Sequence, residues 1–215
     1  MNKKISVEEA VSKIKDGMTI MIGGFLGNGS PHKVIEAISK TNIKNLTVIC
    51  NDTSFPDKGV GILIANKQVK KVITSHIGTN PSTMDQLNAK EIEVEFNPQG
   101  TLVERIRSGG AGLGGVLTPT GIGTVVAEGK DIITVDGKEF LLEKPIFADV
   151  AILAASYGDE EGNLVYMGTS QNFNPIMATA ASIVIAEVND IRKTGSIPKE
   201  CVHTPKIFVD FIVQN

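Results

Sequence analysis

The glycine-rich stretch from residue 23 to residue 29 is the segment whose composition best suits contact with a ligand. It lies between a short apolar run, residues 19–22, and a segment that Ser30-Pro31 opens as a helix. The first N–H groups of a helix lack partners within it, and its dipole favours an anion. The stretch has neither the Gly-Lys-Ser/Thr ending of a Walker A loop nor the spacing of GxGxxG. A tight turn that needs glycine only for its backbone angles is the alternative.

Two amide side chains follow other predicted strands and form a second candidate site. Asn51 comes directly after the apolar run 46–50, and Gln99 follows the run 92–96. Ligands gather at the carboxyl ends of strands in open α/β sheets, and amides there can donate hydrogen bonds to a carboxylate or a developing oxyanion without titrating. A local Asx-turn at Asn51 and Asp52 is the alternative, and the sequence around Gln99 also suits a plain strand exit.

Other reactive side chains do not suggest a further site. Glu104 and Arg107 are three residues apart on a predicted helix, which is typical of a surface ion pair. The three histidines are scattered and no HExxH motif or Cys/His cluster appears, so we expect no metal site. Ser156 and Ser170 lack the GxSxG elbow of serine hydrolases.

These candidates need a scaffold, and the alternation of strand and helix patterns predicts an α/β fold. Ser6 and Glu9 form a capping box for a first helix. Further helices are predicted at 30–38, 59–66, 82–88, 101–107 and 175–181, and strands at 19–22, 46–50, 69–74, 92–96, 149–155 and 182–188. We therefore expect one domain over residues 1–215, with a mixed, mostly parallel sheet flanked by helices.

Two segments between residues 109 and 142 interrupt this alternation. The segment 109–123 is a loop by composition, yet it carries apolar residues such as Leu113 and Leu117. We expect it to contact another chain, with burial inside this chain as the alternative. Asp136-Gly137 between alternating residues predicts a two-residue hairpin within 132–142, whose antiparallel pair would join the sheet.

The composition excludes several classes of function. The chain has 215 residues, 41% hydrophobic and 21% charged content, and a formal net charge of −3, so it offers no basic excess for nucleic acid. Its apolar runs have strand length and its first residues lack the apolar stretch of a secretory signal. We therefore expect no membrane role and a cytoplasmic location. Cys50 and Cys201 lack CxxC spacing, and Cys50 ends an apolar run, which favours a buried, reduced thiol.

Several blocks of the sequence together resemble the signature of family I coenzyme A transferases. They are the stretches 16–25 with 29–31, 51–53, 97–102 with 104–107, 109–124 and 172–175. Because these blocks are spread over nearly the whole chain, the resemblance extends along its length. Within the family, the chain is most similar to alpha subunits of acetate, butyrate and acetoacetate CoA-transferases.

The resemblance implies chemistry that this chain shares with a second one. In the family, a glutamate of the homologous beta chain attacks an acyl-CoA and forms an acyl-glutamyl anhydride and then a glutamyl-CoA thioester. Coenzyme A is thus a substrate, and no cofactor is bound permanently. The resemblance implies that Asn51 and Gln99 face the carboxylate being exchanged. It assigns contact with coenzyme A to Gly23, Gly24, Phe25, Leu26, Gly27, Asn28 and Gly29.

The same resemblance implies a beta-subunit partner, in a hetero-oligomer of two alpha and two beta chains or more, and short carboxylic acids as substrates. Two other functions are kept as alternatives. An acyl-CoA hydrolase would let water into the anhydride step and release free CoA without an acceptor acid. A noncatalytic module would bind a sugar phosphate or another effector at the glycine-rich loop, without coenzyme A.

Overall fold

Short runs of branched aliphatic residues form a seven-stranded sheet in the computed structural model, which describes residues 3–215. Every neighbouring pair in this sheet is parallel, in the order β13-β11-β8-β1-β2-β3-β4. The predicted α/β fold with a mostly parallel sheet is therefore confirmed. The strands are β1 (Thr19–Ile22), β2 (Leu46–Ile49), β3 (Val69–Thr74), β4 (Glu93–Phe96), β8 (Ala148–Ala155), β11 (Ala181–Val188) and β13 (Phe211–Gln214).

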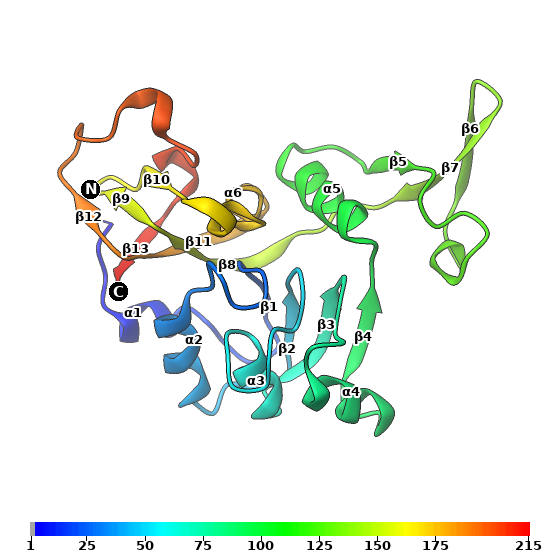
Figure 1. Cartoon of the computed structure of the whole chain (residues 1–215), viewed down its shortest axis with the longest axis horizontal. Coiled ribbons are helices and arrows are strands. Elements are labelled where there is room, and N and C mark those ends of the chain that lie inside the picture. Colours follow the sequence, from blue (N-terminus) through cyan, green and yellow to red (C-terminus); the bar gives the residue numbers. More distant parts are fainter. Residues whose placement is uncertain (1–2) are drawn as a thin grey trace.

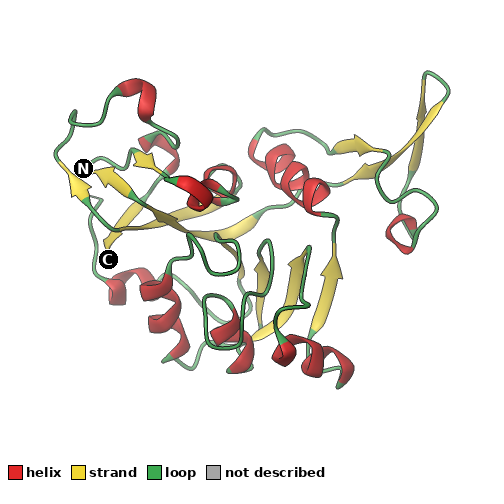
Figure 2. Cartoon of the chain, viewed as in Figure 1, coloured by secondary structure: helices red, strands yellow, loops and turns green. Residues whose placement is uncertain are grey.

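Helices cover both faces of the sheet, as Figures 1 and 2 show. On β1, Ile20 and Ile22 belong to the apolar cluster of one face and Met21 to that of the other, so the strand is buried on both faces. One face packs against α1 (Val7–Val11), α2 (His32–Ser39), α3 (Gly61–Ala65) and α4 (Pro81–Asn88), and the other against α5 (Gln99–Gly110) and α6 (Asn174–Met177).

The order of the strands reverses at β1. From β1 the chain moves outward through β2, β3 and β4, and it later returns to β8 on the other side of β1 before continuing to β11 and β13. Ligands in open α/β sheets bind outside the carboxyl ends of the strands at such a switch point. The glycine-rich loop, residues 23–29, leaves the carboxyl end of β1 and therefore lies there.

The predicted hairpin forms, but it does not join the large sheet. Its strands, β6 (Ile132–Val135) and β7 (Lys138–Glu143), are connected by Asp136 and Gly137, both at positive φ. β5 (Val116–Thr118) pairs with the free edge of β7, which gives the hairpin its own three-stranded sheet. Residues 116–143, here called the arm, project from the body of the molecule (Figure 1). The expectation that the hairpin joins the main sheet was wrong.

Helix α5 is longer than predicted at both ends, because Gln99, Gly100, Gly109 and Gly110 are helical and not in loops. A Cβ on Gly109 would lie 2.3 Å from the carbonyl oxygen of Ile146, and one on Gly110 would lie 2.0 Å from Thr179 Oγ1. Glycine therefore allows α5 to pack closely against neighbouring segments. Composition alone cannot distinguish this use of glycine from a flexible loop.

The remaining elements are short. A second three-stranded sheet contains β9 (Tyr157–Asp159), β10 (Leu164–Val165) and β12 (Ile191–Arg192), and 3₁₀ turns are η1 (Val125–Ala127), η2 (Gly168–Gln171), η3 (Lys199–Cys201) and η4 (Lys206–Phe208). Cys50 is buried and free, as expected, and burial raises the pKa of its thiol. Within residues 3–215, no helix has the length and apolar character needed to cross a membrane.

Candidate functional site

The structure brings together the two amide side chains predicted from the sequence. Asn51 follows β2, Gln99 begins α5 after β4, and Gln99 Nε2 donates a hydrogen bond to Asn51 Oδ1 at 2.7 Å. Ser75, which follows the intervening strand β3, donates to the backbone oxygen of Asn51 at 2.7 Å. Asn51 is 1% exposed, whereas Gln99 is exposed. Gln99 is therefore the member of the pair that can reach a ligand.

Asp52 holds this pair in place through a hydrogen bond to Asn51. Its carboxylate accepts hydrogen bonds from Asn51 Nδ2 at 2.8 Å, from the N–H of Ser54 at 2.8 Å and from the N–H of Leu26 at 3.0 Å. The bond to Ser54 is the Asx-turn that the sequence offered as an alternative, and it forms at Asp52. The turn and the amide pair thus coexist. Asp52 is 5% exposed and fully engaged, so it is not available as a nucleophile.

The glycine-rich loop contains a tight turn whose flanking residues, Phe25 and Asn28, face solvent, whereas Gly27 at its tip is buried. Phe25 and Asn28 exchange two backbone hydrogen bonds, 2.9 and 2.8 Å long, across Leu26 at φ 48° and Gly27 at φ 80°. Two successive positive φ values are typical of a type I′ turn, which favours glycine. Phe25 is 40% exposed and Asn28 is exposed, so these side chains are available to a ligand.

Two asparagines from the chain after η2 hold the other side of the loop. Asn172 Oδ1 accepts from the N–H of Gly24 at 3.2 Å, and Asn172 Nδ2 donates to the oxygen of Asn28 at 3.2 Å. Asn174 is fully buried and donates to the oxygen of Gly29 at 2.9 Å. A Cβ on Gly23 would lie 1.8 Å from Asn174 Oδ1, so this approach requires glycine. The loop is held from both sides.

The loop does not offer the open anion site expected from its position before a helix. The N–H groups of Gly23, Gly24 and Leu26 already donate to oxygens elsewhere in the chain. Glu187 Oε2 accepts from the N–H of Val34 at 3.0 Å and so fills the N-terminus of α2 with a carboxylate. Burial raises the pKa of Glu187. The expectation of free helical amides was therefore wrong, and any ligand must meet the exposed surface of the turn.

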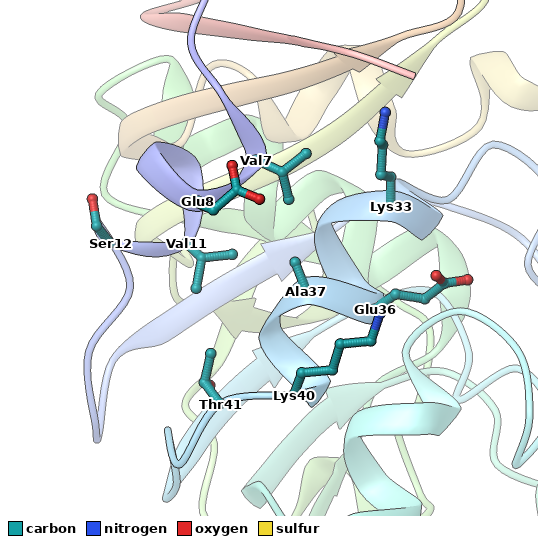
Figure 3. Close-up of a pocket in the computed structure, with 9 residues that line it drawn as sticks. All are labelled: Val7, Glu8, Val11, Ser12, Lys33, Glu36, Ala37, Lys40 and Thr41. Atoms are coloured by element: carbon teal, nitrogen blue, oxygen red, sulfur yellow. The ribbon is translucent and has the colours of Figure 1, made fainter.

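Two cavities adjoin these residues. One, of about 300 Å³, lies at the switch point and is lined by residues from the ends of β8 and β11 and from the segment that leads into α2, among them Ser156, Glu187 and Ser30. The other, of about 540 Å³, is a groove between α5 and β5 that includes Pro98 and Gly100, on either side of Gln99. A separate groove of about 650 Å³ lies between α1 and α2 (Figure 3) and includes none of the candidate site residues.

The remaining sequence candidates behave as local structure. Glu104 and Arg107 form the expected exposed ion pair, at 3.1 Å. His32 Nε2 contacts the oxygen of Gly27 at 2.9 Å and so supports the turn. In the part of the chain that the structure describes, no group of three or more His, Cys, Asp or Glu side chains could hold a metal ion. The supporting roles of Asp52, Asn172 and Asn174 were missed, although all three lie within the sequence blocks that resemble the transferase signature.

A family model described as Coenzyme A transferase matches residues 4–215. The acetoacetyl-CoA:acetate/butyrate CoA transferase alpha subunit of Clostridium acetobutylicum is 54% identical over 215 residues, which are 100% of this chain and 99% of that protein. The acetate CoA-transferase subunit alpha of Escherichia coli is 48% identical over 211 residues, 98% of this chain and 96% of that protein.

Solved structures agree on the fold. An acyl-CoA transferase from Escherichia coli, solved as a thioester complex with CoA, superimposes with a TM-score of 0.88 at 24% identity. All of this chain is covered by that comparison, but the chain spans only 47% of the solved one. Glutaconate coenzyme A-transferase from Acidaminococcus fermentans gives a TM-score of 0.86 at 18% identity, over 99% of this chain and 75% of that one. With the family model and the identities above, the chain therefore belongs to the coenzyme A transferase family of enzymes.

Proposed function

We propose that residues 1–215 form the alpha-type subunit of a heteromeric coenzyme A transferase. The enzyme moves CoA between short-chain acyl-CoA, such as acetyl-, butyryl- or acetoacetyl-CoA, and a free carboxylate such as acetate or acetoacetate. The observation that carries the proposal is the exposed Gln99 amide, held by buried Asn51 beside the glycine-rich loop. The names of the two relatives, both alpha subunits of such enzymes, support the assignment.

The chemistry explains why an amide donor suits this site. A carboxylate is a weak nucleophile towards a thioester, so the reaction gains from groups that stabilise the oxyanion without titrating. Gln99 uses one N–H of Nε2 to bind Asn51, and the second N–H can donate to a substrate oxygen. As the family resemblance implies, we assign the attacking carboxylate to a glutamate of a partner beta subunit. Asp52 is buried and engaged, so it is not available for that role.

On that partner glutamate, the proposed reaction proceeds through two covalent intermediates, and each step transfers an acyl group and releases a leaving group. Its oxygen attacks the thioester carbonyl, and CoA leaves as the thiolate, which gives an acyl-glutamyl anhydride. The thiolate then attacks the glutamyl carbonyl and expels the first carboxylate, leaving a glutamyl-CoA thioester. A second carboxylate reverses both steps and departs as the new acyl-CoA. No oxidant or reductant enters these steps.

We assign contact with coenzyme A to the glycine-rich loop, Gly23 to Gly29. The exposed side chains of Phe25 and Asn28 and the adjoining 300 Å³ cavity support this assignment. Coenzyme A enters as a substrate in this account, and the enzyme holds no permanent cofactor. We place it in the cytoplasm as a hetero-oligomer of two alpha and two beta chains or more.

We further propose that the partner docks on one face of the arm. The register places the side chains of Leu117, Ile133, Val135, Phe140 and Leu142 on the same face of the small sheet, with the exposed Lys138 beside Val135 at its end. Ile133 is 38% and Val135 41% exposed, an apolar surface that a small sheet ordinarily covers. Leu117 also lines the groove that includes Pro98 and Gly100, so a chain seated on this face would lie beside Gln99.

Acyl exchange between acetyl-CoA and butyrate or acetoacetate tests the proposed function. We expect no exchange with this chain alone and exchange after co-expression with the neighbouring reading frame as the source of the beta chain. Release of free CoA without an acceptor acid, in place of exchange, would instead identify an acyl-CoA hydrolase. Binding of a sugar phosphate without coenzyme A would favour the noncatalytic module.

A further inference from the structure

The carboxylate of Asp52 joins two segments of the chain at the carboxyl edge of the sheet, residues 51–54 and the glycine-rich turn. It binds its neighbour Asn51, the N–H of Ser54 two residues later, and the N–H of Leu26 in the glycine-rich turn. Leu26 and Ser54 both have positive φ, 48° and 54°, which residues other than glycine rarely adopt. Asp52 thus holds two unusual backbone conformations in place from a site that is 5% exposed.

The charge of Asp52 also determines the direction of the hydrogen bonds beyond it. An ionised carboxylate only accepts, so Asn51 must turn its Nδ2 toward Asp52 and its Oδ1 toward Gln99. Gln99 must then turn its Nε2 toward Asn51. A side-chain amide can otherwise flip by exchanging its oxygen and nitrogen, and here the carboxylate selects one of the two orientations for both amides.

We propose that Asp52 is a positioning residue that fixes the orientation of the Gln99 amide through Asn51. This inference rests on the proposed function, because it assigns the oriented Gln99 Nε2 to the oxyanion. It goes further by giving a largely buried acid a defined part in turnover. Asp52 acts through Gln99 and does not itself touch the substrate.

Asp52→Asn is the informative substitution, because it keeps the shape of the side chain and removes the acceptor-only property. An amide nitrogen opposite Asn51 Nδ2 would set donor against donor, which favours a flip of Asn51 and frees Gln99. We expect kcat of the assembled enzyme to fall about tenfold to a hundredfold, with a smaller change in KM. Asp57→Asn, at an exposed aspartate of the same loop, is the matched control and should leave kcat unchanged.

A double-mutant cycle distinguishes positioning from general destabilisation. If Asp52 acts through Gln99, Asp52→Asn should change kcat by less than about threefold in a Gln99→Ala background. Asn51→Ala interrupts the same path while sparing the bonds of Asp52 to the backbone, so it provides an independent cycle should Asp52→Asn fail to fold. Equal losses of kcat with and without Gln99 would overturn the proposal.

The side-chain amide signals of Gln99 in a ¹⁵N-labelled full chain give a readout that needs no activity. The Gln99 signals are identified as those that are present in the wild-type spectrum and absent from that of Gln99→Ala. We expect the Nε2 proton that binds Asn51 to lie downfield, and to move upfield in Asp52→Asn or Asn51→Ala but not in Asp57→Asn. Unchanged Gln99 signals would overturn the inference even in an active enzyme. If the wild-type subunits, assembled together, showed no exchange activity, the proposed function would be contradicted. The Gln99 amide signals would still decide whether Asp52 orients Gln99.

Discussion

Replacement of Gln99 by alanine is expected to lower kcat of the assembled enzyme about 10²- to 10³-fold, the usual cost of losing one oxyanion donor. The KM for acyl-CoA should change much less, because we assign Gln99 to the oxyanion and the binding of coenzyme A to the glycine-rich loop. The substitution removes the exposed donor and also leaves Asn51 Oδ1, in a side chain 1% exposed, without the donor at 2.7 Å.

Steady-state kinetics of the assembled enzyme, measured in both directions of CoA transfer, test this effect. Glu104→Gln is a suitable control, since Glu104 lies on the same helix in an exposed ion pair with Arg107 and should leave kcat intact. Turnover of Gln99→Ala equal to wild type would remove Gln99 from the site. A rise in KM with kcat unchanged would indicate that Gln99 binds the substrate equally well in the ground state and in the transition state.

A charge on the apolar face of the arm should have the second large effect. We expect Ile133→Lys to weaken binding of the partner beta subunit by about 30-fold to 1,000-fold, which corresponds to roughly 2–4 kcal/mol for an unpaired charge at the centre of an apolar contact. Ile133 lies on the same face as Phe140, its partner across the strands, and is flanked there by Val135. Turnover at saturating partner should be little changed.

Thr134→Lys is the matched control, because the adjacent residue on the strand points to the opposite face and is already exposed. Titration of this chain with the partner gives the dissociation constants. Equal affinities for the two variants would show that the partner binds elsewhere. A change in self-association of this chain, with unchanged binding of the partner, would show that the face joins two copies of the chain.

Much of this architecture could be predicted from local patterns. The apolar run at residues 19–22, the Pro31 helix start and the Asp136-Gly137 turn each leave a short-range signal, and each element formed where it was expected. The contact between Asn51 and Gln99 could also be anticipated, because parallel strands bring their carboxyl ends to one edge. Whether these two residues act in catalysis stays a prediction.

Long-range contacts account for what the sequence did not reveal. The use of the loop amides depends on Asp52 and Asn172, and the latter is about 150 residues away from the loop in the chain. Gly109 was predicted to lie in a loop because its segment is rich in glycine. In the structure its missing Cβ lets α5 approach Ile146 closely, and composition cannot reveal such a contact. The hairpin was assigned to the wrong sheet because the pairing of β5 with β7 carries no local signature.

The location of the reactive carboxylate is the central claim, and intact-mass measurement of the separated subunits tests it most directly. The assembled enzyme would be incubated with acetyl-CoA in the absence of an acceptor acid and then dissociated. The account predicts a coenzyme A adduct on the partner chain and an unmodified mass for this chain. An adduct on this chain would contradict the account and would direct attention to Glu104, which lines the groove beside Gln99.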